Sequence, residues 1–375
     1  MGLLRFMLAL AVASGHASSF FDADIYPKMT GSHAVQVFYI ISGFLIALIL
    51  SGKYADTPQG NWIFYSNRAV KIYVPYLAIL AVTVVTWLVV FAASGKAGPL
   101  QVFVNEGSTM GFGAWAFAIV TNLLLIGMEW GSMLIYRGGE LLLSVRAIEQ
   151  PPNAIDFTII VPAWTLSLEL AFYLIAPFIL RRHFIVIAAL AAASYTFRFQ
   201  AYALGYRSIA TEYRFFPFEL SLFLYGALSY RFYVFLKERN MFKPALSLSI
   251  TLVCVLTAFA LPKYFRQHQH QMYAVVGILL PALFDFSTRH RWDKWLGDLS
   301  YPLYLVHWPI FVVVLAALSE SGRGSFVAYA VVAASIGSAI AINHALVYPI
   351  DVWRQRRARI VSVRDTDKED RMALA

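Results

Sequence analysis

Ten separate stretches of the chain are apolar over the length that a helix needs to cross a lipid bilayer, about 20 residues. With 375 residues, of which 59% are hydrophobic and 14% charged, and a mean hydropathy of +0.64, the chain cannot fold around one water-soluble core. We therefore expect an all-α, polytopic membrane helix bundle. The expected spans are residues 3–20, 33–51, 70–93, 163–180, 183–200, 215–236, 244–262, 270–287, 299–318 and 325–350.

The chain is basic, with a formal net charge of +9 and a pI near 9.5. In a soluble protein this balance would favour a nucleic-acid partner, but here Lys and Arg lie in short gaps between apolar stretches. There they are expected to fix the topology and to meet anionic lipid of the bilayer, so no nucleic-acid partner is predicted. The single cysteine, Cys254, excludes a disulfide within the chain and a thiolate metal cluster, and we expect no metal site.

Basic clusters recur in alternate gaps, which predicts that both termini are cytoplasmic. The clusters are Lys53, Arg68 and Lys71; Arg181 and Arg182; Arg231, Lys237, Arg239 and Lys243; Arg289, Arg291 and Lys294; and Arg354, Arg356, Arg357 and Arg359. The gap 129–162 is richer in carboxylates and is expected outside. One gap contradicts the alternation, because 198–214 should also lie outside and holds Arg198, Arg207 and Arg214.

Three segments need separate interpretation. The short apolar stretch 114–127 is interrupted by Thr121 and Asn122, and an even number of spans requires it to be re-entrant or to lie on the membrane surface. Arg5 and the apolar residues before Gly15-His16-Ala17 could instead form a cleaved signal peptide, but a first span that serves as the targeting signal keeps the count even. The charged tail 351–375 is expected to be disordered.

Ionisable residues inside spans need a functional or structural reason. His16 lies eleven residues after Arg5, roughly 16 Å further along a helix. Its imidazole could act as a general base on a sugar hydroxyl, carry an acyl group, or only pack. Arg68 and Lys71 are three residues apart, hence on one helix face, where they could bind a phosphorylated ligand or only satisfy the topology rule.

Two further spans carry polar groups. Glu169 lies one or two turns into its span, and it either pairs with a buried His or Arg or remains protonated. His307 lies within an apolar segment that also presents Tyr301 and Tyr304, and it is a second histidine that could act in chemistry or pack.

Taken together, these segments resemble the acyltransferase-3 family of bacterial integral-membrane acyltransferases, which O-acetylate O-antigen, exopolysaccharide and Nod factor. The likeness covers about residues 3–350 and rests on five motifs in the family's order. They are RFMLALAVASGH, FYIISGFLIALIL, FYSNRAVKIYVPY, PAWTLSLELAFYL and LGDLSYPLYLVHWPIF.

The resemblance implies roles for individual residues. Arg5 and His16 match the family's basic-x10-His pair, with His16 as the catalytic histidine. Arg68 and Lys71 match its arginine pair, although Lys71 keeps the charge without the bidentate geometry of arginine. Together with Arg5 they are expected to bind acyl-CoA.

The remaining three motifs add further residues. Glu169 matches the family's glutamate and is expected to act with His16, which requires their two helices to be adjacent. His307 matches the histidine of the H-W-P segment, beside Tyr304. Ser42 matches the S-G-F-L segment, where Ser42 and Gly43 are expected to form a close helix contact of small residues.

The implied function is a membrane acyltransferase of the bacterial inner membrane, occupying residues 1–350. It would move an acyl group, expected to be acetyl, from cytoplasmic acyl-CoA to a hydroxyl of a cell-surface carbohydrate or glycolipid. The competing class is a secondary transporter or a flippase of a lipid-linked sugar, for which intramembrane His, Arg and Glu would also be reasonable. A sensor or scaffold would need no buried titratable set.

Overall fold

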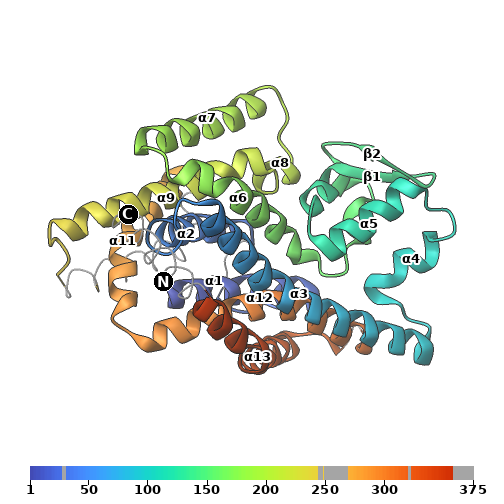
Figure 1. Ribbon diagram of the computed structural model, residues 1–375. Coiled ribbons are helices and arrows are strands. Elements are labelled where there is room, and N and C mark those ends of the chain that lie inside the picture. Colours follow the sequence, from blue (N-terminus) through green and yellow to red (C-terminus); the bar gives the residue numbers. More distant parts are fainter. Residues whose placement is uncertain (28–30, 244–247, 249–268, 320–321, 358–375) are drawn as a thin grey trace.

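The computed structural model describes residues 1–27, 31–243, 248, 269–319 and 322–357. The helices are α1 (Gly2–Phe20), α2 (Gly31–Gly52), α3 (Pro58–Ser94), α4 (Gln101–Glu106), α5 (Phe112–Leu124), α6 (Trp164–Leu180), α7 (Phe184–Ala203), α8 (Ile209–Tyr213), α9 (Phe216–Glu238), α11 (Gln269–Thr288), α12 (Arg291–Ala317) and α13 (Ser325–Ile342). Two short strands, β1 (Leu134–Arg137) and β2 (Glu140–Leu143), and several single 3₁₀ turns complete the described chain (Figure 1).

The predicted helical membrane bundle is confirmed. Within the described ranges, eight helices are long and apolar enough to cross a membrane, and each contains or overlaps one of the expected spans. The expected span 215–236 corresponds to α9, a 23-residue helix that packs against α2 and α7. The expected span 244–262, with Cys254, lies outside the described residues apart from position 248.

Helix α3 is longer than the expected span 70–93. It begins at Pro58 because the side chain of Thr57 accepts a hydrogen bond from Gly60 N at 3.0 Å, and it ends at Gly95, whose φ of 73° is left-handed. Its 37 residues correspond to about 55 Å of helix. Arg68 and Lys71 therefore lie three turns inside a helix, whereas the apolar pattern placed them at its end.

Helices α2 and α9 approach so closely that only glycine fits at two positions. A Cβ atom on Gly43 would lie 1.8 Å from the carbonyl oxygen of Phe223, and a Cβ atom on Gly226 would lie 1.9 Å from that of Ile40. The expected contact of small residues at Gly43 is thus confirmed, and it brings α2 against α9 at backbone distance.

Helices α1 and α12 are joined at their first turns. The carboxylate of Asp293 accepts hydrogen bonds from the backbone N–H groups of Gly2 at 2.7 Å and Leu3 at 2.9 Å, which satisfies donors that the first turn of α1 cannot pair internally. Gly2 also approaches α12 closely, since a Cβ atom there would lie 1.6 Å from the Asp293 carbonyl oxygen. This junction, which we call the Asp293 clamp, fixes the register of α1 on α12.

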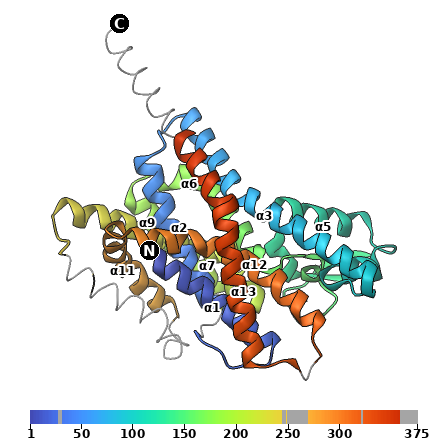
Figure 2. The same ribbon diagram turned by 90° about the horizontal axis from the view of Figure 1, so that it is seen from below.

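Residues between α3 and α6 form a side lobe that Figures 1 and 2 show displaced from the bundle beside α3. It contains α4, α5 and the β1–β2 hairpin, which the apolar pattern did not predict. At 13 residues, α5 is too short to cross a bilayer alone. Its Asn122 donates to the Phe157 carbonyl at 2.7 Å and accepts from Ile159 N at 2.9 Å, so the polar interruption of the stretch 114–127 ties α5 to the segment before α6.

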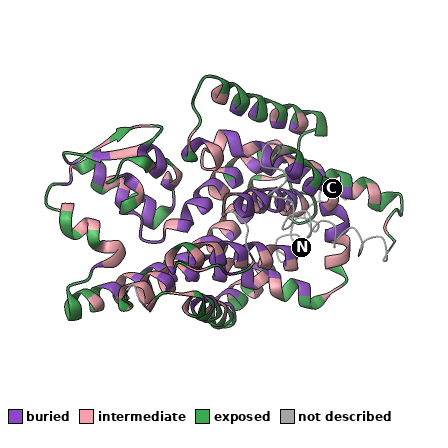
Figure 3. Cartoon of the chain, turned by 180° about the vertical axis from the view of Figure 1, so that it is seen from behind, coloured by how far each residue is buried: buried purple, intermediate pink, exposed green. Residues whose placement is uncertain are grey.

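The outer surface fits contact with lipid. Buried residues gather in the central helices, while the outlying helix α7 is largely exposed (Figure 3). Many side chains of α3 are exposed as well. Exposed side chains on these two helices are large and apolar, among them Val82, Leu88, Phe197 and Phe199. At the other end of the chain, the helical segment that begins at Ser325 continues through a π-helical turn to Arg357, so residues 351–357 of the expected disordered tail are helical; residues 358–375 lie outside the described chain.

Candidate active site

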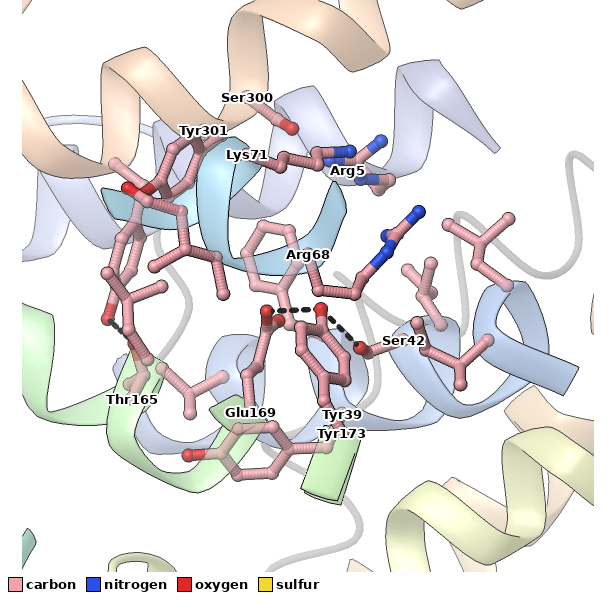
Figure 4. Close-up of a pocket in the computed structure, with 18 residues that line it drawn as sticks. Arg5, Tyr39, Ser42, Arg68, Lys71, Thr165, Glu169, Tyr173, Ser300 and Tyr301 are labelled. Carbon is pink, nitrogen blue, oxygen red and sulfur yellow. Dashed lines mark hydrogen bonds between the residues drawn. The ribbon is translucent and has the colours of Figure 1, made fainter. Parts of the chain in front are cut away.

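The bundle contains a cavity that is lined by three cations from two helices. Arg5 comes from α1, and Arg68 and Lys71 come from α3. Figure 4 shows the ends of Arg5 and Lys71 side by side and Arg68 nearby. This cation cavity has a volume of about 830 Å³, including the part open to solvent, and is also lined by Ser42, Glu169, Tyr173, Ser300, Tyr301 and Tyr304.

No carboxylate of the described residues forms an ion pair with these cations, although Glu169 lines the same cavity. The Nε atom of Arg68 is buried without a hydrogen-bond partner among the described residues. The guanidinium of Arg68 lies near the rings of Phe64 and Tyr173, at 6.0 and 5.9 Å from their centroids. Three converging cations with unused donors are suited to bind the phosphate groups of a ligand.

Glu169 lies on the wall of the cation cavity. Its carboxylate accepts a hydrogen bond from the hydroxyl of Tyr173, one turn further along α6, at 2.7 Å, and that hydroxyl lies 3.5 Å from Ser42 Oγ (Figure 4). Glu169 and His16 line different cavities, and each forms its hydrogen bond with another residue, Glu169 with Tyr173 and His16 with His307.

His16 lines a second cavity of about 720 Å³, including the part open to solvent, which we call the histidine cavity. Around it are Trp164, Tyr213, Arg214 and Trp308. Trp308 meets the His16 ring edge-on, with centroids 5.5 Å apart. His16 is half-buried, so its imidazole can meet a molecule that enters from solvent.

The hydrogen-bond partner of His16 is His307, which is fully buried in α12. His16 Nδ1 lies 2.9 Å from His307 Nε2, and His307 Nδ1 lies 3.2 Å from the carbonyl oxygen of Leu303. A carbonyl only accepts, so Nδ1 of His307 carries its proton, and the Nε2 of a neutral His307 must then accept from Nδ1–H of His16. This network assigns the lone pair of His16 to Nε2, for which the described residues provide no hydrogen-bond partner.

The two cavities follow one another along the same helices. On α12, Ser300 and Tyr301 line the cation cavity, and Trp308 lines the histidine cavity. Tyr304, between them in sequence, lines both, as does Val35 of α2. The hydroxyl of Tyr304 donates to the Pro162 carbonyl at 3.0 Å and accepts from Thr165 Oγ1 at 3.1 Å, which holds the side chain at the boundary.

A comparison with family models decides the family of the chain. A model described as an acyltransferase domain, that of the acyltransferase-3 family, matches residues 1–344. The chain belongs to the acyltransferase-3 family. This membership makes it a multi-pass membrane acyltransferase, and it agrees with the order of the five motifs. No curated protein and no solved structure matches the chain.

The acyltransferase-3 motifs converge in space as two groups. Arg5, Arg68, Lys71, Glu169 and Ser42 line the cation cavity, whereas His16 and His307 meet beside the histidine cavity, and Tyr304 touches both. No group of three or more His, Cys, Asp or Glu in the described ranges could hold a metal ion.

Tyr173 and Arg214 are among the lining residues that the sequence did not identify. Tyr173 follows Glu169 by one helical turn, which could have suggested their hydrogen bond. Arg214 belongs to the gap whose charge contradicts the alternation, and this disagreement was the available signal.

Proposed function

We propose that this membrane acyltransferase moves an acetyl group from cytoplasmic acetyl-CoA to a hydroxyl of a cell-surface glycan or glycolipid, and that it resides in the bacterial inner membrane. The observation that carries the proposal is the succession of the two cavities along α1 and α12, with cations in one and an oriented histidine in the other.

The cation cavity suits the donor. Phosphate groups of CoA would be bound by Arg5, Arg68 and Lys71, whose donors are not used by carboxylates of the described chain. Arg5 and His16 are separated by eleven residues of α1, roughly 16 Å along the helix axis. The pantetheine arm of CoA is of comparable length, so a thioester could extend past Tyr304 towards His16 while the phosphates remain among the cations.

The histidine pair suits proton transfer from the acceptor. His16 Nε2 would take the proton of the acceptor hydroxyl as its oxygen attacks the thioester carbonyl. The carbon–sulfur bond then breaks, the proton passes from His16 to the departing sulfur, and the products are the O-acyl ester and CoA thiol. His307 would act as a positioning residue, because it accepts the Nδ1–H of His16 and supports the imidazolium that forms.

The same lone pair could instead attack the thioester and carry the acyl group before the acceptor does. The two routes differ in one observable, since only the second labels the protein when acceptor is absent. Acid-quenched enzyme incubated with radiolabelled acetyl-CoA alone separates them.

Glu169 is assigned to the donor side. Its carboxylate accepts a hydrogen bond from Tyr173, and the guanidinium of Arg68 lies over the ring of Tyr173. The charge and the hydrogen bond of Glu169 would therefore help to hold Arg68 in place in the cation cavity. We place it with the donor and not as the partner of the imidazole.

The test uses purified protein in lipid nanodiscs with radiolabelled acetyl-CoA and the cell's own polysaccharide fraction as acceptor. Wild type should transfer label, and His16→Ala should not. His344→Ala is the matched control, because this histidine is exposed on the last helix and should be replaceable.

Two outcomes would contradict the proposal. Undiminished transfer by His16→Ala would remove His16 from the chemistry. Folded wild type that consumes neither acetyl-CoA nor succinyl-CoA would favour a transporter, for which movement of a lipid-linked sugar without any donor is the corresponding measurement.

A further inference from the structure

Residues 198–214, expected outside, hold three arginines, one in α7 and two between α7 and α9, and two of the three form ion pairs. Arg198 forms a buried ion pair with Glu219, and Arg207 forms an exposed one with Glu212 at 3.0 Å. These two cations therefore serve local structure. Arg214 is different, because it forms no ion pair with any described residue.

Arg214 faces the histidine cavity. It directly follows α8 and lines the cavity together with His16. Its guanidinium carbon lies 4.6 Å from the ring centroid of Trp164 and 5.4 Å from that of Tyr213. Its Nε atom is buried and has no hydrogen-bond partner in the described chain.

The rings of Trp164 and Tyr213 contact the guanidinium of Arg214, whereas its in-plane N–H groups form no hydrogen bonds with the described residues. Aromatic rings attract the flat side of the cation, but they cannot accept the in-plane hydrogen bonds of the guanidinium. A half-buried charge with unsatisfied donors gains most from an oxyanion, because a carboxylate or a phosphate can receive two parallel N–H bonds.

We infer that Arg214 binds an anionic group of the acceptor, a carboxylate or a phosphate, and so makes the enzyme selective for acidic glycans. The inference rests on the proposed function, in which the acceptor hydroxyl lies against His16. Since Arg214 and His16 line one cavity, the anionic group and the reacting hydroxyl must be near each other in the acceptor. Two sources share this chemistry: a uronic acid residue and a sugar phosphate.

Equilibrium binding tests the inference without any acyl donor. Calorimetry of the full chain in nanodiscs would use methyl glucuronide, glucose 1-phosphate and neutral methyl glucoside as probes. In wild type at least one anionic probe should bind about tenfold more tightly than the neutral one, as one charge-assisted bidentate contact allows. The probe that does so identifies the source as carboxylate or phosphate.

Variants assign the preference to the residue. Arg214→Gln should lose the tenfold preference, whereas Arg207→Gln should keep it, because Arg207 is a cation of the same gap that is already paired with Glu212. If Arg214→Gln does not fold, Arg214→Lys retains the charge and should weaken the preference without abolishing it.

Equal binding of all three probes by wild type would overturn the inference, and so would a preference that persists in Arg214→Gln. A loss of kcat in Arg214→Gln without any change in probe selectivity would also overturn it and would indicate that Arg214 stabilises the developing oxyanion instead. Failure of the proposed function is separate, because it appears as absent acetyl transfer by wild type and not in the binding of these probes.

Discussion

His16 Nδ1 lies 2.9 Å from Nε2 of His307, and the two rings stack with centroids 5.2 Å apart and planes 15° from parallel. The two residues are 291 positions apart in the chain. Because His307 is in turn bonded to the Leu303 carbonyl, the order of donors fixes which nitrogen of His16 has the free lone pair. In the proposed mechanism, His307 would take the place that a carboxylate has in the hydrolase triads, with a neutral ring in place of a charge.

Replacement of His307 should slow the chemistry and leave donor binding intact. For His307→Ala we expect kcat to fall about 100-fold, because His16 can then adopt either tautomer, with little change in the KM for acetyl-CoA. Added imidazole should restore part of the rate of this variant, since the small molecule can occupy the vacated volume. An equal loss in kcat and in folded yield, with no rescue, would indicate a packing role only.

Replacement of the cations Arg68 and Lys71 should raise the KM for the donor and change kcat less, the opposite of the effect expected for His307. Arg68→Gln and Lys71→Gln should each raise the KM for acyl-CoA about tenfold, the effect of losing one charge-assisted contact, and kcat should change less. Lys71→Arg should keep the KM or lower it, because arginine adds a bidentate fork. Arg182→Gln is the control on an exposed arginine, and a KM that is insensitive to Arg68 would place the donor elsewhere.

Tyr304 should limit the size of the acyl group, because it stands where the two cavities meet. In Tyr304→Ala the ratio of butyryl to acetyl transfer should rise about tenfold, within the range that small changes in pocket size produce. Tyr301→Ala is the matched control, since Tyr301 lines the cation cavity but not the histidine cavity. The same ratio in both variants would show that the boundary does not select the acyl chain.

Gly43→Ala should destabilise the bundle. Its new Cβ atom would meet the Phe223 carbonyl at 1.8 Å, which forces α2 and α9 apart and should reduce the free energy of unfolding by about 2 kcal/mol or more. Gly52→Ala, at the end of the same helix, would meet nothing within 4 Å and should be neutral. Thermal unfolding in detergent compares the two, and equal Tm values would contradict the close contact.

Glu129 should make stability depend on pH. It lies outside the spanning helices, where burial raises the pKa of its carboxyl above the ordinary 4.5, although the hydroxyl of Ser167 donates to it and lowers the pKa in part. The folded chain therefore holds this proton more tightly than the unfolded one. Stability should fall as the pH rises from 4.5 through the raised pKa.

Comparison with Glu129→Gln isolates this effect. The amide has no proton to lose in this range, so the Tm of the variant should depend less on pH between 4.5 and 7. Parallel Tm curves for wild type and variant would show that the carboxyl of Glu129 does not titrate in this window.

The apolar pattern predicted the spanning helices well, because length and hydropathy determine what a bilayer accepts. It missed the first turns of α3, because residues 58–69 are too polar to be recognised as part of a span. A signal was present, since Thr57 followed by Pro58 is typical of a helix N-terminus. The β1–β2 hairpin also had a signal: Gly138 and Gly139, with φ of 56° and 89°, form the two-residue turn that such hairpins favour.

The candidate site was only partly predictable. The resemblance selected His16, His307 and the cations, but one sequence contains no information about which spans are neighbours. The placement of Glu169 and His16 in different cavities depends on helix packing alone, as does the meeting of two histidines 291 positions apart.

The Asp293 clamp holds the first turns of α1 and α12 together, so positions along both helices can be counted from the same point. His16 follows Gly2 by fourteen residues on α1, and His307 follows Asp293 by fourteen residues on α12, so the two histidines meet at equal distances along the chain from the clamp. The alignment of the two histidines therefore depends on the carboxylate of Asp293, which lies at the opposite end of these two helices. A substitution of Asp293 would therefore misalign the histidine pair although it changes neither imidazole.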